Sequence, residues 1–231
     1  VKECAPFENV YTLALRGLHD RAMNASNDMG DRKDMLQEAL MAQRQMLIDA
    51  IGKPGEEIPQ AFTPYKEVLD VYDEGLELPD DVTIIWPDDN YGYMKRLSSP
   101  KEQKRSGRSG VYYHSSYLGK PHDHLWMNTV SPTLMYEELR KAYDATADRI
   151  WLLNAGDIKS CEFAVDYFLT MAFDIDAFNF ERAANYRTEW LCGMLGDQYR
   201  NEYQDVVNSF YKLAFARKPE FMGWGYQWTT D

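Results

Sequence analysis

The chain alternates short apolar, β-branched runs with segments of helical periodicity, and this alternation limits its fold more than any other feature. The clearest run is 82–86, which turn residues bound and which is too short and too β-branched for a helix. Four more runs are predicted strands, at 10–15, 58–63, 110–115 and 150–154. Strands that alternate with helices favour a parallel sheet covered by those helices.

The helical segments complete this α/β pattern. Apolar residues recur at helical spacing in segments 31–51, 65–75, 131–143 and 162–173, and from 176 onward helix follows helix. Five strands are fewer than a closed barrel needs. We therefore predict part of a TIM-like (β/α)8 barrel at 1–175, with the rest of the barrel before Val1, followed by an α-helical region at 176–231. An open doubly wound sheet is the alternative, although no strand leads into a glycine-rich phosphate loop.

Charge and cysteine content exclude several functions. The net charge of −12 at pH 7 argues against a nucleic-acid partner or an anionic membrane surface. No apolar run is long enough to span a bilayer. The three cysteines, Cys4, Cys161 and Cys192, fit neither a disulfide framework nor a zinc motif and are predicted to be buried hydrophobic residues.

Polar residues follow the end of each predicted strand. The carboxyl ends of parallel strands share one edge, so these side chains should converge on one catalytic or binding pocket. Taken singly, each also fits a helix cap or a surface charge. The residues are Arg16, His19 and Asp20; Tyr65, Lys66 and Glu67; Asp88, Asp89 and Asn90; His114; and Asn154, Asp157 and Lys159.

A strand-end pocket that is rich in carboxylates favours glycoside hydrolysis by two carboxyl groups, because the chain lacks a serine or cysteine nucleophile motif. The 14% aromatic content suits surfaces that stack on sugars. A divalent-metal-dependent hydrolase is one alternative: Asp88, Asp89, Asp157 and His114 are acceptable ligands, although their spacing is not diagnostic. A non-catalytic carbohydrate-binding module on the same scaffold is another.

Five segments of the chain, in the same order, resemble glycoside hydrolase family 115. The resemblance extends to 217–221 and so covers nearly the whole chain. Because family members are much longer, it implies the C-terminal part of a catalytic barrel plus part of the helical domain that follows. The segments are YTLALRGLHD (11–20), PYKEV (64–68), PDDVTIIWPDDNYG (79–92), GVYYH (110–114) and LNAGDIK (153–159).

The resemblance implies an inverting xylan α-1,2-glucuronidase, which removes glucuronic acid or its 4-O-methyl ether from glucuronoxylan polymer or oligosaccharides. It also implies that no cofactor or metal is required, that the full-length protein is a homodimer, and that it is secreted or periplasmic.

The resemblance assigns the catalytic pair as well. Asp20, in the Arg-Gly-x-x-Asp motif, is the expected general acid, and Glu67, in Tyr-Lys-Glu, is expected to position or activate water. Asp88 and Asp89 are reserve carboxylates. The expected substrate-binding residues are Arg16, His19, Lys66, Asp88, Asp89, Asn90, His114, Asn154, Asp157 and Lys159.

The cations in this set have two compatible interpretations. They can hold the carboxylate of a uronic acid through charge-assisted hydrogen bonds. Alternatively, Arg16, Lys66 and Lys159 neutralise Asp20, Glu67 and Asp157 at a crowded strand-end face.

Overall fold

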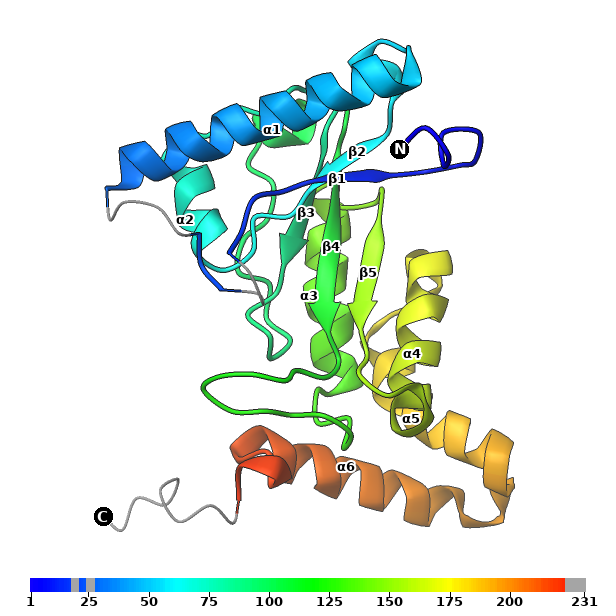
Figure 1. Cartoon of the computed structure of the whole chain (residues 1–231). Helices are drawn as coiled ribbons and strands as arrows, with labels where there is room; N and C mark the ends of the chain where they lie inside the picture. Colours follow the sequence, from blue (N-terminus) through cyan, green and yellow to red (C-terminus); the bar gives the residue numbers. More distant parts are fainter. Residues whose placement is uncertain (18–20, 24–27, 223–231) are drawn as a thin grey trace. The chain divides into compact units, whose positions relative to one another are not determined.

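The computed structural model describes residues 1–17, 21–23 and 28–222. Its five strands form one sheet in sequence order (Figure 1). They are β1 (Tyr11–Leu13), β2 (Gln60–Phe62), β3 (Thr83–Pro87), β4 (Ser109–His114) and β5 (Trp151–Asn154). The strands are parallel and curl as a half-barrel with covering helices, followed by a helical segment. This confirms the predicted fold class.

The helices also follow the predicted pattern. They are α1 (Met29–Ile51), α2 (Glu67–Asp73), α3 (Pro132–Asp144), α4 (Ile158–Phe173), α5 (Phe180–Leu195) and α6 (Arg200–Ala216). The predicted start of α4 at 162 was wrong by four residues. Gly156 turns the chain at φ 58°, and Asp157 then takes the N-cap position with an extended backbone, so the helix begins directly after the strand-end turn.

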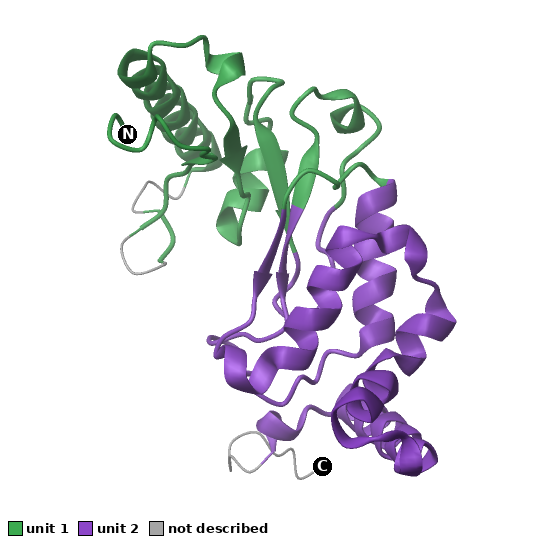
Figure 2. Ribbon diagram, turned by 90° about the vertical axis from the view of Figure 1, so that its right-hand side faces the viewer, with its two compact units in different colours: residues 1–87, 97–110, 145–150 green, residues 88–96, 111–144, 151–231 purple. Residues whose placement is uncertain are grey.

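The chain divides into two compact units (Figure 2). Unit 1 comprises 1–87, 97–110 and 145–150, and unit 2 comprises 88–96, 111–144 and 151–231. The division passes through β4, whose first two residues belong to unit 1. Because this division is not a boundary along the chain, the predicted one at 175/176 stays a prediction.

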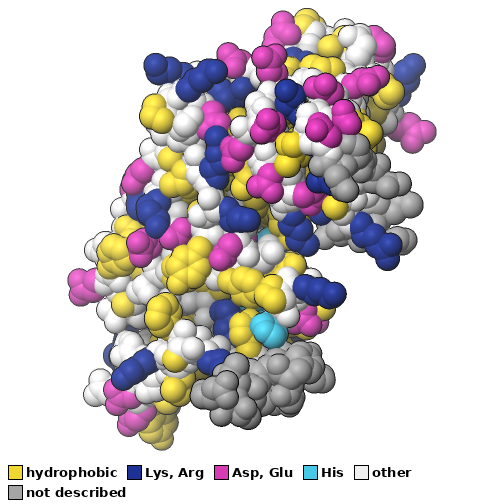
Figure 3. Space-filling view, turned by 90° about the vertical axis from the view of Figure 1, so that its left-hand side faces the viewer, with side chains coloured by type: hydrophobic (Ala, Val, Ile, Leu, Met, Phe, Trp, Pro, Cys, Tyr) yellow, Lys and Arg dark blue, Asp and Glu magenta, His cyan; other side chains and the backbone are white. Residues whose placement is uncertain are grey.

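The core of unit 1 lies between its strands and α1. Leu36, Leu40 and Leu47 recur on one face of α1 and are buried with Leu13 and Phe62. Figure 3 shows acidic side chains gathered in the upper part of the face and hydrophobic ones lower down.

The core of unit 2 is largely aromatic. Phe168 of α4 packs against Tyr113 of β4 and Trp151 of β5, with ring centroids 6.3 and 5.6 Å away. The neighbouring residue of α4, Tyr167, packs against Tyr186 of α5 with ring centroids 4.8 Å apart. Such pairs stabilise packing by about 0.5–1.5 kcal/mol beyond the area they bury.

The structure also tests the predicted burial of the three cysteines. Cys161 and Cys192 are buried as predicted, whereas the prediction for Cys4 was wrong, because it lies exposed in the turns before β1. Among the described residues, no helix is long and apolar enough to cross a membrane.

Candidate active site

In unit 1, the residues after β1 and β2 form a bidentate ion pair. Nε and Nη2 of Arg16 each donate to one carboxylate oxygen of Glu67, both at 3.2 Å. The two side chains are about one-fifth exposed, at 18% and 20%. Two parallel bonds fix the orientation of a carboxylate as well as its position. Glu67 is therefore a preorganised carboxylate at the mouth of the sheet.

An unusual backbone conformation places Glu67. Lys66 has φ 52° and ψ −121°, a region costly for a residue with a Cβ, and the amide of Val68 closes the turn onto the carbonyl of Tyr65 at 3.1 Å. The ring of Tyr65 faces both the guanidinium of Arg16 at 5.3 Å and the ammonium of Lys66 at 5.1 Å. Strain of this kind is found where a site fixes side-chain geometry.

In unit 2, the site is organised by Asp88, which directly follows β3. Its carboxylate is 1% exposed and accepts the backbone N–H groups of Asn90, Gly92 and His114 at 3.0, 3.2 and 3.1 Å. It also pairs with Nδ1 of His114 at 2.6 Å. With four donors around it, this carboxylate holds the strand-end loop and the imidazole in place.

His114 and Asn154 are partners at the ends of β4 and β5, where they occupy the same register position. Nδ1 of His114 is the ring nitrogen that bonds the carboxylate of Asp88. The amide nitrogen of Asn154 donates to the hydroxyl of Tyr112 at 3.0 Å, and the ring of Tyr112 lies 4.6 Å from that of His114. The imidazole is therefore held by a buried carboxylate on one side and an aromatic ring on another.

The loop after Asp88 is held by its own side chains. Asp89 accepts the amides of Tyr91 and Tyr93 at 2.8 and 3.1 Å. Asn90 and Gly92 have φ values of 75° and 100°, a region in which asparagine and glycine are favoured. Asp88, Asp89 and Asn90 thus shape a rigid strand-end loop, and their predicted contacts with substrate stay predictions.

The sequence pattern did not assign a role to His124, which is part of this site. Its Nε2 lies 2.6 Å from the carbonyl oxygen of Asn90 and donates to it, and its ring lies 5.3 Å from that of Tyr91. Burial lowers the pKa of His124, against an opposing effect of the bond to Asn90. The cluster of His122, Asp123 and His124 in a single loop was the only sequence signal for it.

We expect this histidine to make unit 2 less stable in mild acid. Because the pKa of His124 is lower in the folded state, the unfolded chain takes up a proton first as the pH falls below 6.5. The contribution of the neutral His124 to the free energy of unfolding is therefore complete above pH 6.5. It is lost as the pH falls through the lowered pKa of the folded state. A variant with His124→Gln keeps an N–H donor for Asn90 and should flatten this pH dependence in thermal melts between pH 5 and 7.5. An unchanged slope in the variant would contradict the assignment.

A second contact that the sequence did not reveal joins the 119–128 loop to the segment after α6. The carboxylate of Glu220 accepts three successive backbone N–H groups, those of Leu125, Trp126 and Met127, at 2.6, 3.2 and 3.1 Å. Successive amides form an anion-binding concavity. Glu220 thereby holds the loop that carries His124.

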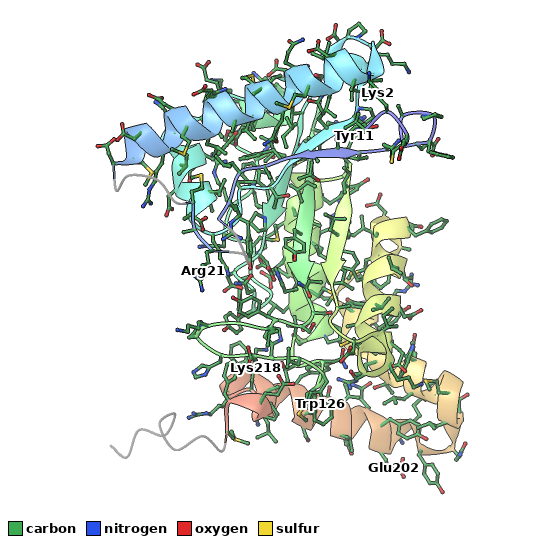
Figure 4. The ribbon with its side chains drawn as sticks, in the orientation of Figure 1. Lys2, Tyr11, Arg21, Trp126, Glu202 and Lys218 are labelled. Atoms are coloured by element: carbon green, nitrogen blue, oxygen red, sulfur yellow. The ribbon has the colours of Figure 1, made fainter. Side chains whose placement is uncertain are left out.

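Loss of this carboxylate should loosen the loop. Because charge-assisted bonds contribute about 1.5–3 kcal/mol, we expect Glu220→Ala to speed hydrogen exchange of the three amides by roughly 10- to 100-fold. Mass spectrometry of the peptide that spans 125–127 measures this. Glu202→Ala, at an exposed position on α6 (Figure 4), is the matched control and should leave the exchange unchanged.

The remaining predicted residues lie elsewhere. His19 and Asp20 fall outside the described residues. Asp157 and Lys159 are exposed at the start of α4, and the ammonium of Lys159 pairs with Glu162 at 3.0 Å. The prediction that Lys159 neutralises Asp157 was therefore wrong. A lysine in the first turn of a helix lies next to the acid three residues further on, which here is Glu162. The predicted neutralisation of Glu67 is made by Arg16.

No group of three His, Cys, Asp or Glu side chains that could hold a metal ion occurs within the described part of the chain.

Parallel strands in one sheet, with polar side chains at or after their carboxyl ends, are typical of the (β/α)-barrel class of proteins. Within that class, the sequence model of "Glycosyl hydrolase family 115" matches residues 1–221. The chain therefore belongs to glycosyl hydrolase family 115.

One solved structure is a close relative. It is BtGH115A, described as a novel family GH115 4-O-methyl-α-glucuronidase with specificity for decorated arabinogalactans. It matches this chain with a TM-score of 0.90 and 43% sequence identity over 96% of the chain. This chain spans 29% of the length of that protein. No curated protein sequence matches the chain.

Proposed function

We propose that this chain supplies part of the active site of an α-glucuronidase that removes glucuronic acid, or its 4-O-methyl ether, from the side chains of a polysaccharide. The observation that carries the proposal is the 43% identity to a 4-O-methyl-α-glucuronidase over 96% of this chain. The preorganised carboxylate of Glu67 at a strand end supports it independently.

The proposed reaction is a single displacement with inversion. Glu67 takes a proton from a water molecule, which attacks the anomeric carbon from the face opposite the leaving group. The bond from that carbon to the glycosidic oxygen breaks, and the oxygen takes a proton from Asp20. The two carboxyl groups must stand about 6.5–9.5 Å apart to leave room for the water. The product is then released as the β-anomer from an α-linked substrate.

The polar groups at the ends of the strands suit a uronic acid. In the proposed complex, Arg16 and Lys66 face the substrate carboxylate, and Asn90 and Asn154 bond its hydroxyls. Asp88 acts as a positioning residue, because its carboxylate already accepts four donors from the protein. His114 is the group it positions.

The polysaccharide backbone has two candidates. Glucuronoxylan, as polymer or oligosaccharide, is the substrate that the sequence resemblance predicts. Decorated arabinogalactan is the second, because the relative is described as specific for it. Both present the same reacting group, so the strand-end chemistry is common to the two proposals. We further propose that the protein acts as a secreted or periplasmic homodimer and requires no cofactor.

Release of uronic acid tests the function. The full-length protein is incubated separately with glucuronoxylan and with a glucuronylated arabinogalactan, and the products are separated by anion-exchange chromatography. We expect release from at least one of them, and the ratio of the two rates identifies the backbone. Binding without release would instead favour the carbohydrate-binding module. Loss of release on treatment with EDTA, restored by a divalent ion, would favour the metal-dependent hydrolase.

A further inference from the structure

Unit 2 contains a cavity of about 510 Å³ that shares no lining residue with the predicted strand-end site. It lies beside the C-terminal end of α6, and Figure 4 shows Lys218 at this end of the helix. Its size falls in the range typical of small-molecule sites. The lining includes Tyr91, His122, Thr129, Tyr211, Lys218 and Phe221.

Two cations line this cavity, Arg217, whose Nη2 donates to the carbonyl oxygen of Phe221 at 3.3 Å, and Lys218. The ammonium of Lys218 donates to the hydroxyl of Thr129 at 2.9 Å, and that neutral group is its one hydrogen-bond partner among the described residues. Glu220, the acid nearest to it in sequence, has its carboxylate bound to three backbone amides. An ammonium has three N–H donors, so Lys218 can donate to a ligand as well.

The environment of this ammonium favours an anion. Burial lowers the pKa of Lys218 to about 8, against the weaker attraction of Glu220 and Asp89. The side chain is thus still mostly charged at neutral pH, but its charge is poorly solvated. A bound carboxylate would offset that cost through a charge-assisted hydrogen bond.

The walls of the cavity suit a sugar ring better than a simple anion. The ring of Phe221 lies 4.7 Å from that of His122 and meets the ring of Tyr91 edge-on at 6.1 Å. The hydroxyls of Thr129 and Ser131 add polar groups beside this aromatic wall. In Figure 3, hydrophobic side chains gather with a histidine and several cations in the lower part of the face.

We propose that this cavity is a second glycan subsite, in which Lys218 binds the carboxylate of a uronic acid unit. The choice of a uronic acid rests on the proposed function, because a polysaccharide decorated with glucuronic acid carries such carboxylates repeatedly along its length. The subsite would hold one unit while another occupies the strand-end site.

Competitive acylation of the full-length protein tests the proposal without any turnover. At pH 8, acetic anhydride labels neutral lysines, and peptide mass spectrometry gives the rate for Lys218. An opposite charge nearby raises a lysine pKa by at least about one unit, so glucuronate should slow the labelling of Lys218 by about fivefold or more. Glucose, the uncharged probe, should not. Lys212, exposed on α6, is the internal control and should react equally under all conditions.

Two variants complete the experiment. Lys218→Met should remove one of two glucuronate sites detected by calorimetry, whereas Lys212→Met should keep both. Equal labelling of Lys218 with and without glucuronate would overturn the proposal, whether or not the variants fold. Protection of Lys218 in a protein that releases no uronic acid would keep the subsite and reject the proposed function. Release of uronic acid without protection of Lys218 would keep the proposed function and reject the subsite.

Discussion

The variant Glu67→Gln is expected to lower kcat on the glucuronylated substrate by about 10²- to 10⁴-fold, the contribution typical of a positioned acid or base. The amide keeps the size of the carboxylate and one acceptor oxygen for Arg16, but it cannot accept a proton from water. Affinity for substrate should change by only a few-fold, because the substituted group acts mainly in the transition state. Initial rates and equilibrium binding on the same full-length variant measure the two effects separately.

Glu74→Gln is the matched control for this substitution. Glu74 lies at the C-terminal end of the same helix, α2, and is exposed, so its loss should change neither rate nor affinity. If Glu67→Gln kept more than about a tenth of the wild-type kcat, Glu67 would be no more than a binding residue, and Asp88 or Asp89 would become the next carboxylate to test.

The second large effect is expected at Asp88. Removing its carboxylate by Asp88→Ala takes an acceptor from three backbone N–H groups, two of them buried, and from the imidazole of His114. Breaking a buried pair of this kind typically costs about 3–5 kcal/mol. We expect the free energy of opening of the 88–94 loop, measured by hydrogen exchange, to fall by about that amount. Turnover should fall as well, because the carboxylate no longer holds His114 in place.

Asp88→Asn separates the two consequences. The asparagine oxygen can still accept from the loop, but its NH2 group faces donors, so stability should fall less than in Asp88→Ala while the imidazole still loses its charged partner. The control is Asp205→Asn on the exposed side of α6, which should have no effect. Wild-type exchange in Asp88→Ala would show that the loop does not depend on this carboxylate.

The fold could be predicted from sequence because its information is local. The buried run 82–86 and the helical spacing of 31–51 each specify one element, and the order of elements then implies a parallel sheet. Even the unfavourable Pro59 was compatible, since it lies directly before β2 and only its carbonyl pairs, with the amide of Tyr11 at 2.9 Å. The start of α4 was misplaced because it depends on a turn at Gly156.

The site was predictable only where its residues follow strands. Glu67 and Asp88 follow strands and His114 ends one, so the rule of strand ends selected them, and their roles stay predictions. The pairing of Arg16 with Glu67 spans 51 residues, and that of Glu220 with Leu125 spans 95, so no spacing in the sequence signals them. His124 and Lys218 were missed for the same reason, because their contacts depend on how a long loop and a helix end pack together.

The anomeric form of the first product tests the account most directly. The full-length protein is mixed with the glucuronylated polysaccharide that it cleaves faster, and proton NMR follows the released uronic acid before mutarotation. The proposed mechanism, with Glu67 and Asp20 on opposite sides of the bond, predicts the β-anomer first. Initial appearance of the α-anomer would contradict the attack of water on the substrate, since retention requires two displacements.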